Sequence, residues 1–173
     1  MQHSEKRKKE DIGRLSPDAL IEHQRRTVEE HILQEERGNW DEVYHTFTSH
    51  QDDAYLDVVA FQRRFKHMEG VREFYETFSK AFMDFDITIH TEVDVPGVSF
   101  REAQVKATHK GEYCGIAPSG VRVSIPMAGI FVFDTQTGQL NAERVYFDNN
   151  TILEQIQGMM SFEGVFDLGR IEG

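Results

Sequence analysis

The chain has 173 residues, of which 39% are hydrophobic and 28% charged, and this composition is typical of a globular protein with one domain. Its formal net charge of −11 argues against nucleic acid and anionic membranes as partners, because phosphate groups are bound by clustered Lys and Arg. A single cysteine, Cys114, excludes an intrachain disulfide and a thiolate metal cluster.

The sequence pattern predicts neither a membrane helix nor a signal peptide. No apolar run approaches the ~20 residues that a membrane helix needs. A signal peptide has an apolar segment after its basic residues, and no such segment follows the basic residues near this N-terminus. A cytoplasmic location is therefore expected.

The first predicted element is a long helix. Residues 1–15 are polar and lack periodicity, and they are expected to form a flexible arm. Ser16-Pro17-Asp18 is a strong helix start, with Ser16 as the cap, Pro17 in the first turn and Asp18 favoured by the helix dipole. A partial apolar stripe then continues to about Arg37.

Two shorter helices are predicted next. Trp40 to Phe47 places apolar residues at the i, i+3, i+4 and i+7 positions of a helix. Residues 51–57 are predicted to be a loop entering a short strand, whereas residues 58–68 show no clear period. A third helix follows Glu69-Gly70, and one of its faces is strongly aromatic, with Val71, Phe74, Tyr75, Phe78, Ala81 and Phe82.

From Asp84 onward the hydrophobic period changes to two, which is the period of a half-buried strand. Strands are predicted over residues 84–94, 103–110, 121–133 and 140–147. A bulge or bend is expected at Pro126, because proline cannot donate a hydrogen bond to a neighbouring strand. A short helix capped near Asp148 ends the pattern.

Helices first and antiparallel strands afterwards predict an α+β domain, which covers residues 16–158 and leaves 159–173 as a tail. The four long strands are expected to form a curved sheet that folds around the helices, with a pocket between the concave face and the helices. Because the strand over 121–133 is apolar on both faces, a homodimer through the open face of the sheet is also expected.

From Gly111 to Gly158 the order of residues resembles the SnoaL-like polyketide cyclases of the nuclear transport factor 2-like superfamily. The matching features are His109-Lys-Gly111 running into Gly115-Ile-Ala-Pro-Ser-Gly120, the Gly138-Gln-Leu140 hairpin, and Asp148 followed by Leu153-Glu-Gln-Ile156. With the upstream helices included, the resemblance covers about residues 18–158. It implies a cone-shaped, cystatin-like domain, in which a curved antiparallel sheet wraps round three N-terminal helices.

One departure from the family pattern bears on the activity. In the cyclases that the chain resembles, an aspartate three residues before the position of Asp148 acts as acid/base. Here Val145 stands at that place, and valine cannot transfer a proton. Two hypotheses follow: a cofactor-independent cyclase, isomerase or hydratase-type enzyme acting on a small carbonyl or polyketide-like compound, or a non-catalytic module for ligand binding or dimerisation.

Two residues on inward faces are candidates for the missing acid/base. His109 lies on an apolar strand face, and a half-buried histidine titrates near neutral pH; the alternative is a structural histidine. Glu143 shares a face with Val145, and burial among Phe side chains raises the pKa of a carboxyl group. The alternative for Glu143 is a dimer contact or a salt bridge to Arg122 or Arg144.

Asp57 is the third catalytic candidate, placed where related epoxide hydrolases keep a Tyr and an amide that hold water. The alternative is an aspartate that caps a turn. The residues expected to line the pocket and bind a small apolar ligand are Tyr55, Phe74, Phe78, Met127, Val145 and Phe147. No cofactor is implied, and the histidines show no HExxH or comparable spacing, so no metal site is predicted.

Overall fold

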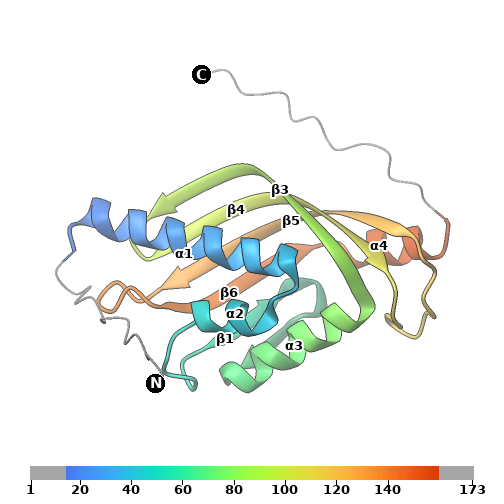
Figure 1. Ribbon diagram of the computed structural model, residues 1–173, viewed down its shortest axis with the longest axis horizontal. Coiled ribbons are helices and arrows are strands. Elements are labelled where there is room, and N and C mark those ends of the chain that lie inside the picture. Colours follow the sequence, from blue (N-terminus) through green and yellow to red (C-terminus); the bar gives the residue numbers. More distant parts are fainter. Residues whose placement is uncertain (1–14, 160–173) are drawn as a thin grey trace, which may run out of the picture.

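The computed structural model describes residues 15–159 as one curved sheet with helices across its inner face (Figure 1). The helices are α1 (Pro17–Arg37), α2 (Trp40–Thr46), α3 (His67–Ala81) and α4 (Asn149–Ile156). The strands are β1 (Tyr55–Val58), β2 (Arg63–Lys66), β3 (Phe82–Val95), β4 (Val98–His109), β5 (Arg122–Phe133) and β6 (Leu140–Phe147). The predicted arm (1–15) and tail (159–173) lie almost wholly outside the described residues.

The strand order across the sheet is β2-β1-β6-β5-β4-β3. All neighbours are antiparallel except β1 and β6, which pair in parallel. Helices α1, α2 and α3 cover one face, as Figure 1 shows. The arrangement confirms the predicted α+β class and the curved sheet wrapped around three helices, whereas the homodimer through the other face stays a prediction.

Both ends of α1 and the start of α4 lie where the local sequence predicts them, whereas α3 begins at His67, ahead of the start predicted after Glu69-Gly70, and Phe82 opens β3 instead of continuing the helix. The Ser16 hydroxyl accepts a hydrogen bond from the Ala19 amide at 3.3 Å, and α1 ends at Gly38, whose φ of 67° is left-handed. Asp148 caps α4 through the Asn150 amide at 2.9 Å. The strand β2, by contrast, was not predicted, because its four residues include a single buried side chain and show no alternation.

Of the bulge or bend expected at Pro126, the bulge is absent. Strands β4 and β5 pair without a register shift, with Pro126 opposite Gln104. Pairing between β5 and β6 begins at Met127, so Pro126 lies beyond that ladder. The lack of an N–H at Pro126 therefore costs no hydrogen bond to β6.

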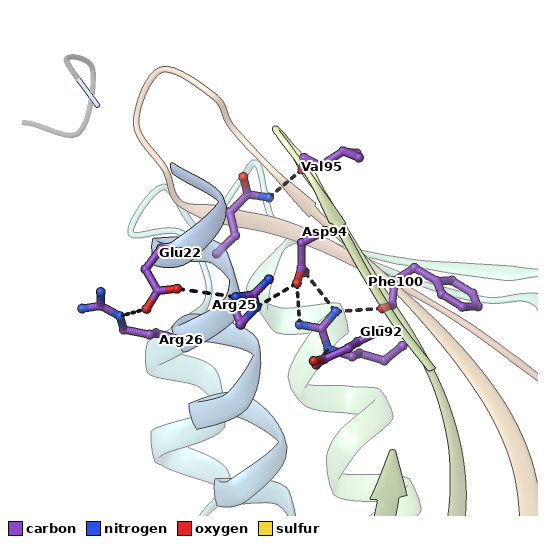
Figure 2. A network of polar contacts seen from close by, with 9 residues as sticks. Glu22, Arg25, Arg26, Glu92, Asp94, Val95 and Phe100 are labelled. Carbon is purple, nitrogen blue, oxygen red and sulfur yellow. Dashed lines mark hydrogen bonds and ion pairs between the residues drawn. The ribbon is translucent and has the colours of Figure 1, made fainter. Parts of the chain in front are cut away.

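The first helix is fastened to the β3–β4 hairpin by a polar network whose centre, Asp94 and Arg101, is buried (Figure 2). Gln24 donates to the Val95 carbonyl at 3.3 Å, and the Asp94 carboxylate accepts from Arg25 at 3.1 Å and from Arg101 at 2.9 Å. The Asp94 and Arg101 side chains are only 2% and 3% exposed. This network fixes the helix that carries part of the pocket wall.

Hydrophobic residues form two clusters, one beneath α1–α3 and one toward α4. The half-buried Phe78 and Phe147 pack against both, so they stand at the boundary between the clusters. Within residues 15–159, no helix has the length and apolar character that crossing a membrane requires.

Candidate functional site

A pocket with a cavity volume of about 70 Å³ lies between the concave face of the sheet and the helices α1–α3, and the volume is about 530 Å³ when the open solvent space at its mouth is included. Its aromatic lining consists of Trp40, Phe74, Tyr75, Phe78, Phe85 and Phe147, and its aliphatic lining consists of Ile87, Val105, Met127 and Val145. Two carboxylates, Glu35 and Glu143, complete the wall. The pocket is therefore apolar except at one acidic end.

Strand alternation explains why Glu143 reaches the pocket. Side chains two residues apart on a strand point to the same face, so Glu143, Val145 and Phe147 of β6 all line the cavity. Glu143 is 5% exposed. A carboxylate therefore stands in the same cavity as Val145, two residues away from the family's acid/base position.

Glu143 belongs to a cluster with Tyr75 of α3 and with His31 and Glu35 of α1. The Tyr75 hydroxyl lies 2.6 Å from Glu143 Oε2 and 3.0 Å from His31 Nε2. His31 Nε2 is also 3.4 Å from Glu35 Oε1 and 3.7 Å from Glu143 Oε2. The Tyr75 hydroxyl thus bridges the carboxylate of the pocket to a fully buried imidazole.

Hydrogen bonds behind the pocket assign the tautomer of His31. The Thr46 hydroxyl lies 2.7 Å from the Val43 carbonyl, to which it donates, and 2.8 Å from His31 Nδ1. A hydroxyl has one hydrogen to donate, so Thr46 accepts from Nδ1 and the ring carries its hydrogen there. Nε2, which faces Tyr75, is then free to accept a hydrogen bond or to hold a second proton.

Two arrangements of one proton satisfy every hydrogen bond of this chain. In the first, imidazolium Nε2 donates to Tyr75, and Tyr75 donates to ionised Glu143. In the second, protonated Glu143 donates to Tyr75, and Tyr75 donates to neutral His31. The two arrangements differ in the position of hydrogens alone, so exchange between them requires no movement of the heavier atoms.

The electrostatics keep this proton available near neutral pH. Burial raises the pKa of Glu143 to about 7, although the neighbouring His31 charge acts in the opposite direction. Burial acts to lower the pKa of His31, but the carboxylates of Glu35 and Glu143 outweigh it and raise the pKa. Burial and the charge of Glu143 raise the pKa of Tyr75 well above its usual value, so Tyr75 stays a hydroxyl.

The same cluster bears on metal binding. The ligand atoms of His31, Glu35 and Glu143 lie within 4.8 Å of one another, close enough in principle for one ion. However, the Tyr75 hydroxyl already hydrogen-bonds both His31 and Glu143. Protons account for the contacts of this group, so we describe it as a hydrogen-bonded cluster.

The structure brings most of the expected ligand-binding residues together. Phe74, Phe78, Met127, Val145 and Phe147 all line the pocket. Tyr55 does not, because its side chain lies on the other face of the sheet, with the Arg64 guanidinium 4.1 Å above its ring.

Asp57 also lies away from the pocket. It is opposite Arg64 in the β1–β2 pair and opposite Arg144 in the β1–β6 pair. Its carboxylate accepts hydrogen bonds from Arg64 at 2.7 Å and from Arg144 at 3.2 Å. The hydrogen bond from Arg64, with help from Arg144, lowers the pKa of Asp57, which suits a structural ion pair rather than a general base.

His109 is fully buried but does not line the pocket. Its Nδ1 accepts from the Ser119 amide at 3.2 Å, and its ring packs 5.4 Å from that of Phe82. Burial lowers the pKa of His109, so the ring is neutral at physiological pH. These contacts match the structural alternative, and of the three expected acid/base residues, Glu143 is the one at the cavity.

Sequence reasoning missed His31, Glu35 and Tyr75 as site residues. Glu35 follows His31 by four positions, so the two lie on one face of α1, and His31 follows the buried Val28 by three. The sequence signal for these two residues is a histidine on the buried stripe of a helix that is followed one turn later by an acidic residue. Tyr75 was placed on the aromatic face of α3, but its hydroxyl partners come from elements distant in sequence.

Three helices across the inner face of a curved sheet, around a pocket with one acidic end, define a nuclear transport factor 2-like domain. The chain belongs to the SnoaL-like polyketide cyclase family, whose model matches residues 23–156. No curated protein matches the chain in sequence.

Solved structures share the fold at low sequence identity. A SnoaL-like protein from Jannaschia sp. CCS1 has a TM-score of 0.70 at 16% identity, covering 82% of this chain and 96% of the other. AclR from Streptomyces galilaeus has a TM-score of 0.68 at 17% identity, covering 82% and 85%. An M. tuberculosis LEH-like epoxide hydrolase has a TM-score of 0.60 at 18% identity, covering 80% and 92%.

Proposed function

We propose that the protein is a cofactor-independent enzyme that moves a proton next to the carbonyl group of a small, mostly apolar compound. Cyclases, isomerases and hydratases of carbonyl compounds share this step. The observation that supports the proposal is Glu143, a buried carboxylate at the acidic end of an apolar pocket, with its pKa raised to about 7. A base with such a pKa is half ionised at neutral pH and accepts a proton efficiently there.

In the proposed step the C–H bond beside the carbonyl breaks, its proton passes to Glu143, and the electron pair moves onto the carbonyl oxygen as an enolate. Return of the proton at another carbon gives an isomer, and attack of the enolate on a second carbonyl closes a ring. The apolar walls exclude water from the enolate. When the cluster has lost its shared proton, Glu143 is ionised and His31 Nε2 is neutral; Tyr75 then lets the accepted proton pass from Glu143 to His31 Nε2, which leaves Glu143 ionised again.

Proton removal can be tested before the natural substrate is known. A panel of apolar ketones, β-diketones and β-ketoesters is incubated with the protein in D₂O, and the exchange of α-hydrogens is followed by NMR. For compounds that fit the pocket, we expect α-hydrogens to exchange faster with the protein present than in buffer alone. If compounds bind but none exchanges, the protein is instead the non-catalytic binding module that Val145 left open.

The shared proton gives a prediction for His31 in the ligand-free protein. In ¹⁵N NMR spectra, His31 is expected as the Nδ1–H tautomer when neutral, and its pKa is expected to fall in a Glu143→Gln variant, because the carboxylate that raises it is gone. In Tyr75→Phe, the titrations of His31 and Glu143 should separate. The exposed His45, paired with Glu42, serves as the control. An Nε2–H tautomer would contradict the assignment.

A further inference from the structure

Glu35 is the second acid of the pocket, and proton removal by Glu143 does not require it. It lies on α1, its side chain is 18% exposed, and its ion-pair partner is His31 at 3.4 Å. Within residues 15–159, no Lys or Arg forms an ion pair with Glu35 or Glu143, and none lines the pocket. The acidic end therefore has no cationic side chain facing the cavity.

The charge of this end does not depend on where the shared proton lies. With His31 protonated and Glu143 ionised, the cluster with Glu35 sums to one negative charge. With His31 neutral and Glu143 protonated, Glu35 alone carries the same charge. A bound molecule thus meets one net negative charge in either arrangement, in a cavity where apolar walls weaken screening by water.

The walls beside this charge are also suited to a cation. Trp40 lines the pocket, with its ring centroid 5.7 Å from that of Tyr75 and 5.9 Å from that of Phe85. The faces of aromatic rings carry partial negative charge and attract ammonium groups, tryptophan most strongly. A protonated or quaternary amine would be favoured by both the rings and the carboxylate, whereas a neutral apolar group gains from the rings alone.

We propose that the ligand of this pocket carries a positive charge: a protonated tertiary amine or a quaternary ammonium group joined to an apolar body, with the charge held at Glu35 and Trp40. The formal net charge of −11 supports the same choice, since it attracts cations from solution. The inference deepens the proposed function, because the ligand is the substrate or product of that site. Binding is measured without turnover, so the preference for a cationic ligand and the proposed proton transfer can each fail while the other holds.

The test compares two probes that differ in charge but not in shape: choline, and 3,3-dimethylbutan-1-ol, in which carbon replaces the charged nitrogen. Trp40 is the one tryptophan of the chain and lines the pocket, so its fluorescence reports occupancy directly. With ionic strength held constant, choline is expected to bind about tenfold more tightly than the neutral alcohol.

Variants on α1 locate the source of this preference. Glu35→Gln is expected to bring the two dissociation constants close together, whereas Glu35→Asp, which keeps the charge, retains most of the difference. Glu29→Gln is the matched control, because it removes the same charge from an exposed position of the same helix. The inference is overturned if choline leaves the fluorescence unchanged, if the alcohol binds as tightly as choline, or if Glu29→Gln weakens choline binding as much as Glu35→Gln does.

Discussion

Replacing Glu143 by Gln is expected to lower α-hydrogen exchange by about 10² to 10⁴-fold, the range that a positioned acid/base contributes. The amide keeps the shape of the side chain and still accepts the Tyr75 hydrogen bond, but it cannot take a proton from carbon. Exchange rates in D₂O, measured on a compound that the wild-type protein turns over, give the ratio. Asp57→Asn serves as the comparison, because Asp57 pairs with Arg64 and Arg144 away from the pocket.

The pH profile should change together with the rate. The base acts when Glu143 is ionised, so wild-type exchange is expected to rise with pH through about 7 and then level off. The residual exchange of Glu143→Gln should lack this step. Equal losses in Asp57→Asn and Glu143→Gln, or a wild-type profile without the step, would count against Glu143 as the base.

Stability should respond to the same substitution in a predictable direction. Burial raises the pKa of Glu143 from 4.5 to about 7, so the folded protein binds more protons than the unfolded chain between these pH values. The free energy of unfolding therefore decreases as pH rises across this window, and Glu143→Gln lacks that decrease. The variant is thus expected to be at least as stable as the wild type above pH 7, so lost exchange would not reflect unfolding.

The second large effect concerns stability and lies far from the pocket. Asp94→Asn is expected to lower the free energy of unfolding by about 3 to 5 kcal/mol, because Arg101 remains buried without its carboxylate partner. Urea unfolding measures the change through the midpoint and slope. Glu22→Gln is the control: it breaks exposed pairs with Arg25 and Arg26 in the same network (Figure 2) and should cost less than about 1 kcal/mol.

The sign of the pH dependence distinguishes Asp94 from Glu143. Burial acts to raise the pKa of Asp94, but hydrogen bonds from Arg101 and Arg25 and the charge of Arg101 outweigh it and lower the pKa. Its contribution to stability is therefore complete above the unfolded-state pKa and is lost as pH falls toward the folded-state value. A loss in Asp94→Asn no larger than that in Glu22→Gln would mean that Glu92, 3.7 Å from Arg101, replaces the missing partner.

The sequence predicted features that depend on neighbours along the chain. The caps at Ser16 and Asp148 are local hydrogen bonds, and strand alternation alone placed Glu143 on the same face as Val145. The parallel pairing of β1 with β6 has no comparable local signal. That pairing sets Asp57 opposite Arg144 and so makes an ion pair of a residue expected to be catalytic.

The rest of the site depends on where separate elements meet. His31 and Tyr75 are 44 residues apart in sequence, and Tyr75 and Glu143 are 68 apart, yet one hydroxyl joins all three. Each side chain taken alone fits an ordinary helix or strand face. The tertiary fold turns a buried histidine and an aromatic residue into partners of the carboxylate, and no periodicity contains that information.

The alternation along β6 also affects how relatives of this protein should be compared. When a strand forms one wall of a cavity, an acid displaced by two positions stays on that wall, so the reactive group can migrate during evolution without a change of backbone. An alignment column in which aspartate is replaced by valine then says little about loss of activity. The useful comparison asks whether any side chain on that wall carries a carboxylate.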